Sequence, residues 1–321
     1  MSQQPVLKDL LDEGGEFDPH YLPSYNSDHL PMALIAMSHL GASDESLVDY
    51  QRHYRKRLRP VQASPALASL EDGRGVPDAY ASNRTFLLEE IAADGWQTVV
   101  RRHLPGLLVS LPTGAFHPLI RLGAGISVGH QLEIASALAY WMTSSFAPVL
   151  PAAVSGQSMA VTLGQDHLNH EPSRAIPPGP FSQGLREIAA RGYPAPVDTS
   201  MQDCASAALD VYLGTRNFFA LHLVTANQAA RMCLPFVVES EMVASLSAGM
   251  RAAYQVLNAP DFTIPLPVPD KIDDEHGIKY VYACTSEYSA WNDPRHLTEI
   301  EGFKREGLVP DWVRPEPEAS V

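Results

Sequence analysis

Apolar residues in this chain recur three and four positions apart, and this helical spacing is the feature that most restricts its fold. Within residues 80–93, Phe86, Leu87 and Ile91 follow the spacing, and Gly95 ends it. Alternation with a period of two is scarce, and the strongest hairpin dipeptide, Asn-Gly, does not occur. The sequence therefore predicts a mainly α protein.

The same spacing, bounded by cap residues, glycine or proline, predicts most of the remaining helices. Residues 116–146 are expected to hold two helices that meet near Gly123, Gly125 or Gly129. The other predicted helices lie at residues 29–39, 44–58, 96–103, 181–190, 204–213, 218–233 and 237–257, with a short one from about residue 273 past 279.

The chain has 321 residues, a length that two domains or one large domain can account for. Proline-rich loops occur at residues 177–180 and 260–269, but the helical pattern resumes after each of them. We therefore expect a single compact helical-bundle domain over residues 21–306, with short proline-rich loops. Residues 1–20 are predicted to form an N-terminal arm, and residues 307–321 an acidic, proline-rich tail.

Charge and cysteine content narrow the classes of partner and compartment. Lys and Arg number 23 against 37 Asp and Glu, which gives a net charge of −14. An acidic chain repels nucleic acid and anionic membranes, and the longest apolar stretches are too short to span a bilayer. Three widely spaced cysteines and an N-terminus without a secretory pattern predict a cytoplasmic protein with reduced thiols. The oligomeric state stays open.

Two short motifs give weaker indications. The segment Gly123–Gly129 is one residue too long for a dinucleotide loop, although it contains the Gly-x-Ser-x-Gly pattern of a serine esterase around Ser127. That pattern requires a strand before it, so close packing at glycines is the favoured interpretation. His167 and His170 belong to a polar cluster between glycine and proline signals, which predicts an exposed loop more than a metal site.

Four histidines stand within apolar surroundings, where a buried imidazole needs a hydrogen bond or a metal. They are His29, His117, His222 and His276, and each lies on a different predicted helix. Core hydrogen bonding explains any one of them, but helical proteins build metal sites by projecting ligands inward from several helices. Lys279 is three residues after His276 and would share its helix face, although a surface lysine paired with Glu275 is the favoured interpretation on the residues alone.

Several segments of the sequence together resemble the questin oxidase-like family. The resemblance spreads over residues 28–279, and its segments occur in the family's order. They are Asp28-His29-Leu30, Ala33-Leu34-Ile35-Ala36-Met37, Leu40-Gly41-Ala42, Phe116-His117-Pro118-Leu119-Ile120-Arg121-Leu122-Gly123, Leu138-Ala139-Tyr140, His222-Leu223-Val224-Thr225-Ala226 and Asp274-Glu275-His276-Gly277-Ile278-Lys279.

The resemblance implies a helical oxidoreductase of aromatic polyketide metabolism that opens quinone-like rings by oxygenation or Baeyer–Villiger-like oxygen insertion. It also implies a non-heme Fe(II), with His29, His117, His222 and His276 as ligands and a carboxylated Lys279. Imidazole suits ferrous iron, and a buried neutral amine can capture carbon dioxide as an anionic carbamate. The expected partners are an aromatic small molecule and dioxygen.

Departures from the family pattern put the substrate in question more than the metal. Many members carry a histidine where Arg121 stands, an asparagine where Asp28 stands and an acidic residue near Ser136. Arg121 lies four residues after His117 and is a candidate to hold an anionic substrate group, or to form a salt bridge. Tyr140 is a second candidate catalytic residue, in an aromatic pocket or in plain core.

Other functions remain open on the sequence alone. A monooxygenase assisted by NADPH or flavin is one, although no nucleotide motif supports it. A metal-dependent hydrolase with the same ligands, a serine esterase at Ser127 and a non-enzymatic binding protein are the others.

Overall fold

The computed structural model describes residues 5–21, 26–177, 179–272, 274–310 and 312. Its α-helices are α1 (Pro5–Gly14), α2 (Leu30–His39), α3 (Asp44–Tyr54), α4 (Tyr80–Asp94), α5 (Trp96–Leu107), α6 (His117–Val128), α7 (Gln131–Ser144), α8 (Met159–Leu168), α9 (Phe181–Arg191), α10 (Met201–Thr215), α11 (Phe218–Cys233), α12 (Glu239–Val256), α13 (Asp274–Trp291) and α14 (Pro294–Arg305). The strands β1 (His20–Tyr21) and β2 (Asn26–Ser27) pair antiparallel. Short 3-10 helices are η1 (Arg55–Arg57), η2 (Glu71–Gly73), η3 (Pro77–Ala79), η4 (Leu108–Ser110), η5 (Thr113–Phe116), η6 (Pro172–Arg174) and η7 (Leu234–Phe236).

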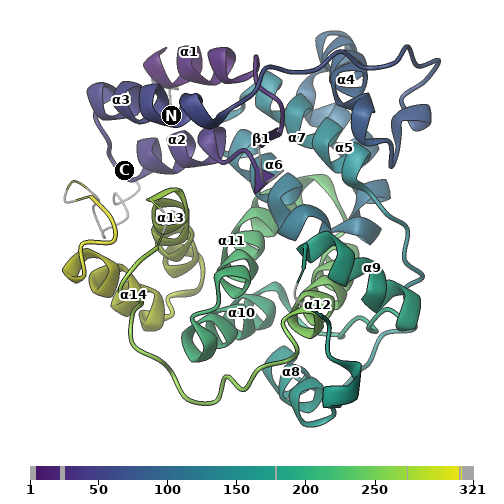
Figure 1. Ribbon diagram of the computed structural model, residues 1–321, viewed down its shortest axis with the longest axis vertical. Coiled ribbons are helices and arrows are strands. Elements are labelled where there is room, and N and C mark those ends of the chain that lie inside the picture. The colour runs from purple at the N-terminus through teal and green to yellow at the C-terminus, as the bar shows by residue number, and fades with distance from the viewer. Residues whose placement is uncertain (1–4, 22–25, 178, 273, 311, 313–321) are drawn as a thin grey trace.

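The helices surround α11, which lies near the centre of the molecule (Figure 1). Helix α11 packs against α6, α10, α12 and α13, and α2 packs against both α6 and α13. Helices α2, α6, α11 and α13 thus form one packed group although they are far apart in the sequence. The predicted mainly α fold is confirmed.

Local sequence signals explain several helix ends. Ser43 accepts a hydrogen bond from the backbone N–H of Ser46 and caps α3, as its position predicts. The two helices expected between residues 116 and 146 separate at Gly129, whose φ of +65° suits glycine. His130 then caps α7 through the backbone N–H of Glu133.

Three helices were not expected, namely α1, α8 and α14, and α13 is far longer than the short helix predicted there. Residues 159–168 form α8, so Asp166 and His167 are helical and the prediction of a loop is wrong for them. Asp166 binds Arg251 of α12, with oxygen–nitrogen distances of 2.7 and 2.8 Å, and His167 Nδ1 lies 2.7 Å from the Ala259 carbonyl. These polar groups join helices, which local sequence patterns do not reveal.

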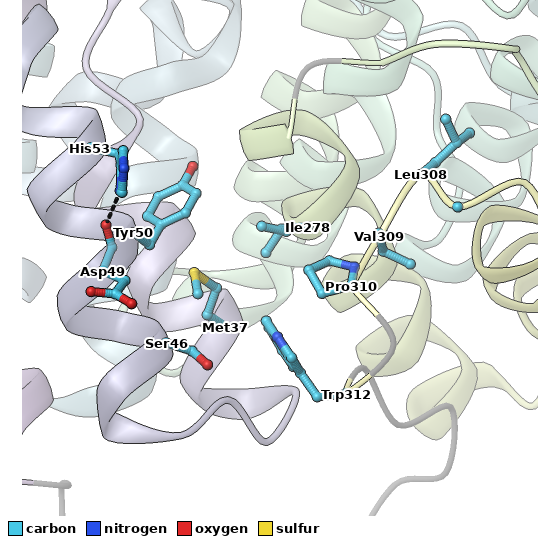
Figure 2. A pocket seen from close by; sticks show the side chains of 11 residues that line it. Met37, Ser46, Asp49, Tyr50, His53, Ile278, Leu308, Val309, Pro310 and Trp312 are labelled. Atoms are coloured by element: carbon cyan, nitrogen blue, oxygen red, sulfur yellow. Dashed lines mark hydrogen bonds between the residues drawn. The ribbon is translucent and has the colours of Figure 1, made fainter.

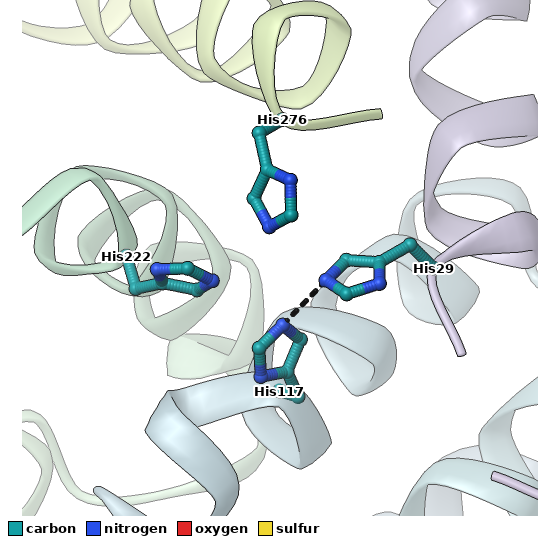
Figure 3. Close-up of side chains that lie close together, drawn as sticks. All are labelled: His29, His117, His222 and His276. Carbon is teal, nitrogen blue, oxygen red and sulfur yellow. Dashed lines mark hydrogen bonds between the residues drawn. The ribbon is translucent and has the colours of Figure 1, made fainter. Parts of the chain in front are cut away.

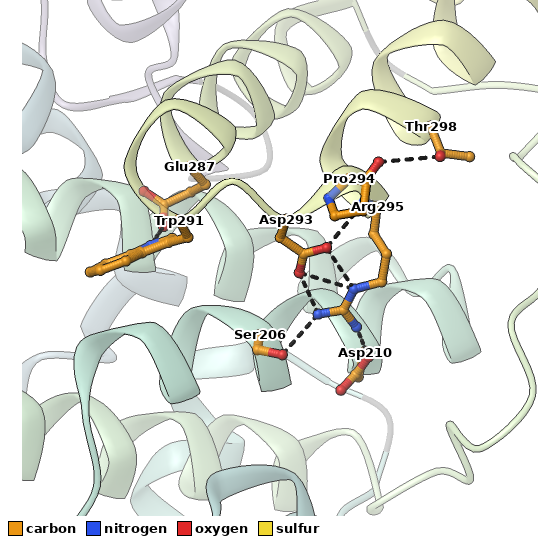
Figure 4. A network of polar contacts seen from close by, with 8 residues as sticks. All are labelled: Ser206, Asp210, Glu287, Trp291, Asp293, Pro294, Arg295 and Thr298. Carbon is orange, nitrogen blue, oxygen red and sulfur yellow. Dashed lines mark hydrogen bonds and ion pairs between the residues drawn. The ribbon is translucent and has the colours of Figure 1, made fainter.

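Polar contacts also anchor the C-terminal helices (Figure 4). Arg295, at the start of α14, binds Asp293, Asp210 and Ser206, and the last two belong to α10. Glu287 of α13 accepts hydrogen bonds from Trp291 and from Arg231 of α11. The network holds α13 against the centre of the bundle.

The glycine-rich segment forms the end of α6. Ser127 lies within α6, so a helix and not a strand leads directly to it, and its hydroxyl donates to the Ala124 carbonyl three residues earlier. The nucleophile elbow and the dinucleotide loop are therefore both wrong for this segment. Gly123 instead allows α6 to approach α11, as the interpretation of close glycine packing predicts.

The two predicted terminal segments are described to different extents. Residues 5–14, within the predicted N-terminal arm, form α1, and Leu7 and Leu11 of this helix are buried in the core. Residues 311 and 313–321 of the predicted tail lie outside the described residues. The domain boundaries stay predictions.

Two further findings concern the whole described chain. Cys204, Cys233 and Cys284 are buried free thiols. None of the helices within the described ranges has both the length and the apolar character needed to cross a lipid bilayer.

The contact between α6 and α11 gives a test of the fold. A Cβ at Gly123 would lie 2.7 Å from Cα and Cβ of Ala229, so Gly123→Ala must push the two helices apart. We expect the free energy of unfolding in urea to fall by about 1–3 kcal/mol. Gly164→Ala in α8 is the matched control, because no atom lies within 4 Å of its added Cβ. Equal stability of the two variants would contradict the packing described.

Candidate metal centre

Four imidazole rings meet in the interior where α2, α6, α11 and α13 pack together (Figure 3). His29 precedes the first residue of α2, His117 begins α6, His222 lies in α11 and His276 lies in α13. One ring nitrogen of each lies within 4.8 Å of the corresponding nitrogens of the other three, and all four residues are buried. The structure thus brings together the four histidines that the sequence singled out.

Hydrogen bonds on the outer side of the cluster orient two of the rings. His117 Nδ1 donates to the Gly114 carbonyl, and His222 Nδ1 donates to the Phe218 carbonyl at 2.9 Å. A neutral imidazole has one donor and one acceptor nitrogen, so these bonds place a lone pair on each Nε2. Outer hydrogen bonds of this kind are typical of metal-binding histidines.

The inner nitrogens face one another. His29 Nε2–H donates a hydrogen bond to the lone pair of His117 Nε2 at 2.8 Å, and the ring centroids of His29 and His276 are 4.5 Å apart. Nε2 of His222 is buried and has no hydrogen-bond partner among the described residues. A buried lone pair without a donor is costly, and a cation among the four rings would satisfy it and could replace the proton between His29 and His117. The donor set therefore fits a transition metal.

Burial keeps this donor set uncharged. It lowers the pKa of all four imidazoles, and that of His222 falls to about 3. The positive charge of Lys279 lowers the four pKa values further. Neutral imidazole is the form that binds metal ions.

Lys279 is only 4% exposed, so its interpretation as a surface lysine is wrong. Burial lowers the pKa of its amine to about 7, although the charges of Glu275 and Asp28 oppose that shift. Glu275 binds Arg57 at 3.1 Å, so its carboxylate already has a cationic partner.

The backbone that carries the Gly114 carbonyl is strained. Gly114, Ala115 and Phe116 all have φ between +54° and +66°, a region that L side chains seldom adopt. Each such non-glycine residue costs on the order of 1–3 kcal/mol, and this kind of strain clusters at functional sites. The turn points the Gly114 carbonyl at His117 Nδ1.

A family model described as questin oxidase-like matches residues 26–191. The chain belongs to the questin oxidase-like family. His29 and His117 lie inside the matched stretch of this questin oxidase-like chain, and His222 and His276 lie beyond it.

Curated relatives of this questin oxidase-like chain come from fungi and match over short stretches. Baeyer-Villiger monooxygenase AacuH of Aspergillus aculeatus is 30% identical over 128 residues, which are 35% of this chain and 27% of the relative. Baeyer-Villiger monooxygenase dmxR6 of a Cryptosporiopsis species is 26% identical over 145 residues, 40% of this chain and 32% of the relative. Baeyer-Villiger oxidase GME11358 of Pestalotiopsis microspora is 39% identical over 67 residues, 19% of this chain and 15% of the relative. The matched stretches thus span less than a third of each relative.

The two other predicted site residues lie in buried polar contacts. Arg121 binds Glu133 of α7 through Nε at 2.8 Å and Nη2 at 3.2 Å, which is the salt bridge considered as its alternative role. Tyr140 Oη lies 2.6 Å from Ser27 Oγ, and burial raises the pKa of Tyr140 to about 12. Their action on a substrate stays a prediction.

Sequence reasoning missed a tyrosine that supports the cluster. Tyr54 of α3 accepts a hydrogen bond from the backbone N–H of His29 at 3.1 Å, and its Oη lies 3.4 Å from His29 Nδ1. In the sequence Tyr54 is one more apolar position of a predicted helix. Its polar role arises from the packing of α3 against α2, and no local pattern marks it.

Replacement of Tyr54 by phenylalanine tests this support. Tyr54→Phe leaves the buried N–H of His29 without its acceptor, so we expect metal-free protein to lose about 1–3 kcal/mol of unfolding free energy. Tyr193→Phe is the control, because the buried Tyr193 hydroxyl has no hydrogen-bond partner within the described part of the chain. Urea unfolding measures both variants. A Tyr54→Phe protein as stable as Tyr193→Phe would show that the hydroxyl does not support His29.

Proposed function

We propose that this protein is a non-heme iron-dependent oxygenase or oxidase that acts on an aromatic or quinone-like small molecule. The reaction would be oxidative ring opening or Baeyer–Villiger-like oxygen insertion, with dioxygen as co-substrate. The observation that carries the proposal is the convergence of four buried, neutral imidazoles with two of their outer nitrogens bound to backbone carbonyls.

The proposed ligands are His29, His117, His222 and His276, with Lys279 as a carboxylated fifth ligand. Imidazole nitrogen suits ferrous iron, and a buried neutral amine can add carbon dioxide to form a carbamate with anionic oxygen. The burial of Lys279 supports the neutral form of its amine. Bound Fe(II) would supply the oxygen chemistry that amino-acid side chains lack.

The protein's own residues would orient the ligands and exclude water. The carbonyls of Gly114 and Phe218 hold two imidazoles in the tautomer with an inward lone pair. The Arg121–Glu133 pair joins α6 to α7 and would keep the helix that begins with His117 in place. Tyr140 and Ser27 would support the same end of α6, because the Tyr140 hydroxyl lies close to Gly114.

The relatives' names support the reaction class. Two are named Baeyer-Villiger monooxygenases and one a Baeyer-Villiger oxidase, although the shared stretches are short. An aromatic polyketide substrate and a single catalytic domain over residues 21–306 follow as proposals. NADPH or flavin assistance gains no support from the glycine-rich segment, which ends helix α6 and forms no phosphate-binding loop.

A metal-dependent hydrolase is the competing proposal, because the same ligands also support it. Histidine nitrogens also suit Zn(II), which activates a bound water for hydrolysis. Oxygen uptake separates the two functions when Fe(II)-loaded protein is mixed with hydroxyanthraquinones. The oxygenase proposal predicts oxygen consumption with product formation, whereas turnover under anaerobic conditions would favour the hydrolase.

Metal loading tests the ligand set directly. We expect purified protein incubated anaerobically with Fe(II) and then desalted to retain about one iron per chain. His276→Ala should weaken iron binding by more than about tenfold, because losing even an outer-sphere partner of a metal ligand costs 10–100-fold. His53→Ala is the control, since His53 is exposed and lies outside the cluster. Mass spectrometry of metal content gives the readout, and unchanged iron in His276→Ala would contradict the assignment.

The carbamate has a separate test. Protein equilibrated with carbon-13 bicarbonate and Fe(II), and then exchanged for diamagnetic Zn(II), is expected to show a carbamate signal in carbon-13 NMR. Lys279→Met should lack that signal while retaining its helical content by circular dichroism. The same signal in Lys279→Met would place the carbamate on another amine and reject Lys279 as the fifth ligand.

A further inference from the structure

The phenyl ring of Phe218 separates two of the clustered histidines from the molecular surface. Its centroid lies 4.5 Å from that of His276 and 5.2 Å from that of His222. Phe218 is 45% exposed, whereas His222 and His276 are 1% and 2% exposed. One side chain in contact with both imidazoles thus also faces the outside.

The outer side of Phe218 faces a pocket. The pocket has a volume of about 490 Å³, within the range of small-molecule sites. Ile272 and Leu308 add apolar side chains beside the Phe218 ring, and Arg216, Asp270, Lys271 and Glu306 add charged groups. The lining therefore suits a flat aromatic molecule that carries polar substituents, because its ring can pack on Phe218.

Hydrogen bonds hold the backbone at Phe218, whereas its ring is held by contacts with the rings of Phe219, His222 and His276. Its carbonyl accepts the hydrogen bond from His222 Nδ1, and Asn217 caps α11 through the backbone N–H of Phe219 at 2.8 Å. Phe218 is the first residue of α11, so no earlier helical turn restricts its ring. Exposed side chains change rotamer within picoseconds to nanoseconds. Rotation of the ring alone would uncover the imidazoles.

We propose that Phe218 is the gate of the active site and that the adjoining pocket binds the planar aromatic substrate. This inference rests on the proposed function, because the gate controls access to the proposed active site. The substrate ring lies against Phe218 and Ile272, and rotation of Phe218 admits the edge of that ring to the histidine cluster. Phe218 acts as a specificity-determining residue, because the space that its ring vacates limits what reaches the cluster.

A second pocket offers the competing route. It has a volume of about 480 Å³ and lies between α2, α3, α13 and the C-terminal segment (Figure 2). Its lining includes Tyr50, whose ring centroid is 5.8 Å from that of Tyr54, and Tyr54 in turn contacts His29. Two tyrosine rings thus stand between this pocket and the cluster, compared with the single ring of Phe218. The shorter route favours Phe218.

Chemical labelling of metal-free protein tests the gate independently of iron. Diethyl pyrocarbonate acylates accessible imidazole nitrogens, and peptide mass spectrometry measures the rate at His222. Phe218→Ala should raise this rate about tenfold or more, because a minor open state is typically populated at 10% or less. Phe218→Trp should lower it. Phe146→Ala is the matched control, since Phe146 packs on Tyr193 and lines neither pocket.

The labelling has an internal standard and a ligand arm. Exposed His53 should react at the same rate in every variant. In the wild type, 1,8-dihydroxyanthraquinone should slow labelling of His222, and Ile272→Ala should weaken this protection. An unchanged His222 rate in Phe218→Ala would overturn the gate and point to the pocket beside Tyr50. Protection that persists in Ile272→Ala would overturn the assigned binding pocket.

Failure of the gate and failure of the proposed function give different results. Phe218→Ala is expected to keep the wild-type iron content, because its side chain supplies no ligand. Faster labelling in a protein that binds no iron would support the gate and reject the iron-dependent function. Wild-type labelling rates in an iron-binding Phe218→Ala protein would reject the gate alone.

Discussion

The convergence of four buried histidine nitrogens is the constraint on which the rest of the structure depends. Inward lone pairs held a few ångströms apart disfavour one another unless a proton or cation lies between them. The fold nevertheless maintains this arrangement through the packing of helices α2, α6, α11 and α13. The backbone at Ala115 and Phe116 adopts strained positive φ angles just before α6. Such strain is expected where the geometry serves chemistry.

The surroundings of the cluster are consistent with that purpose. Two imidazoles donate outward to backbone carbonyls, and Tyr54 holds the backbone of His29. Lys279 is buried on the same helix as His276. These contacts come from the backbone and from neighbouring helices, so the fold itself orients the imidazoles.

Much of the fold follows from the sequence because helices are encoded locally. The cap at Ser43, the break at Gly129 and the apolar spacing of α4 each depend on residues within a few positions. Helix α8 was missed because its polar residues suggest a loop until Arg251, 85 positions away, pairs with Asp166. The sequence therefore predicts helices whose signals are local and misses those stabilised by tertiary contacts.

The candidate site was partly predictable for the same reason. Four histidines in apolar segments could be identified from the sequence, although their convergence is a property of the packed helices. Arg121 was considered for a substrate and for a salt bridge, and only the structure shows Glu133 beside it. Tyr54, the Gly114 carbonyl and the exposed ring of Phe218 gain their roles from contacts across the fold or from exposure, neither of which a single sequence displays.

Anomalous X-ray diffraction at the iron edge, on crystals of anaerobically loaded protein, tests the central claim most directly. A single anomalous peak among Nε2 of His29, His117 and His222 and a nitrogen of His276 is the predicted result. A peak at a surface carboxylate, or none between the four rings at full iron occupancy in solution, would contradict it.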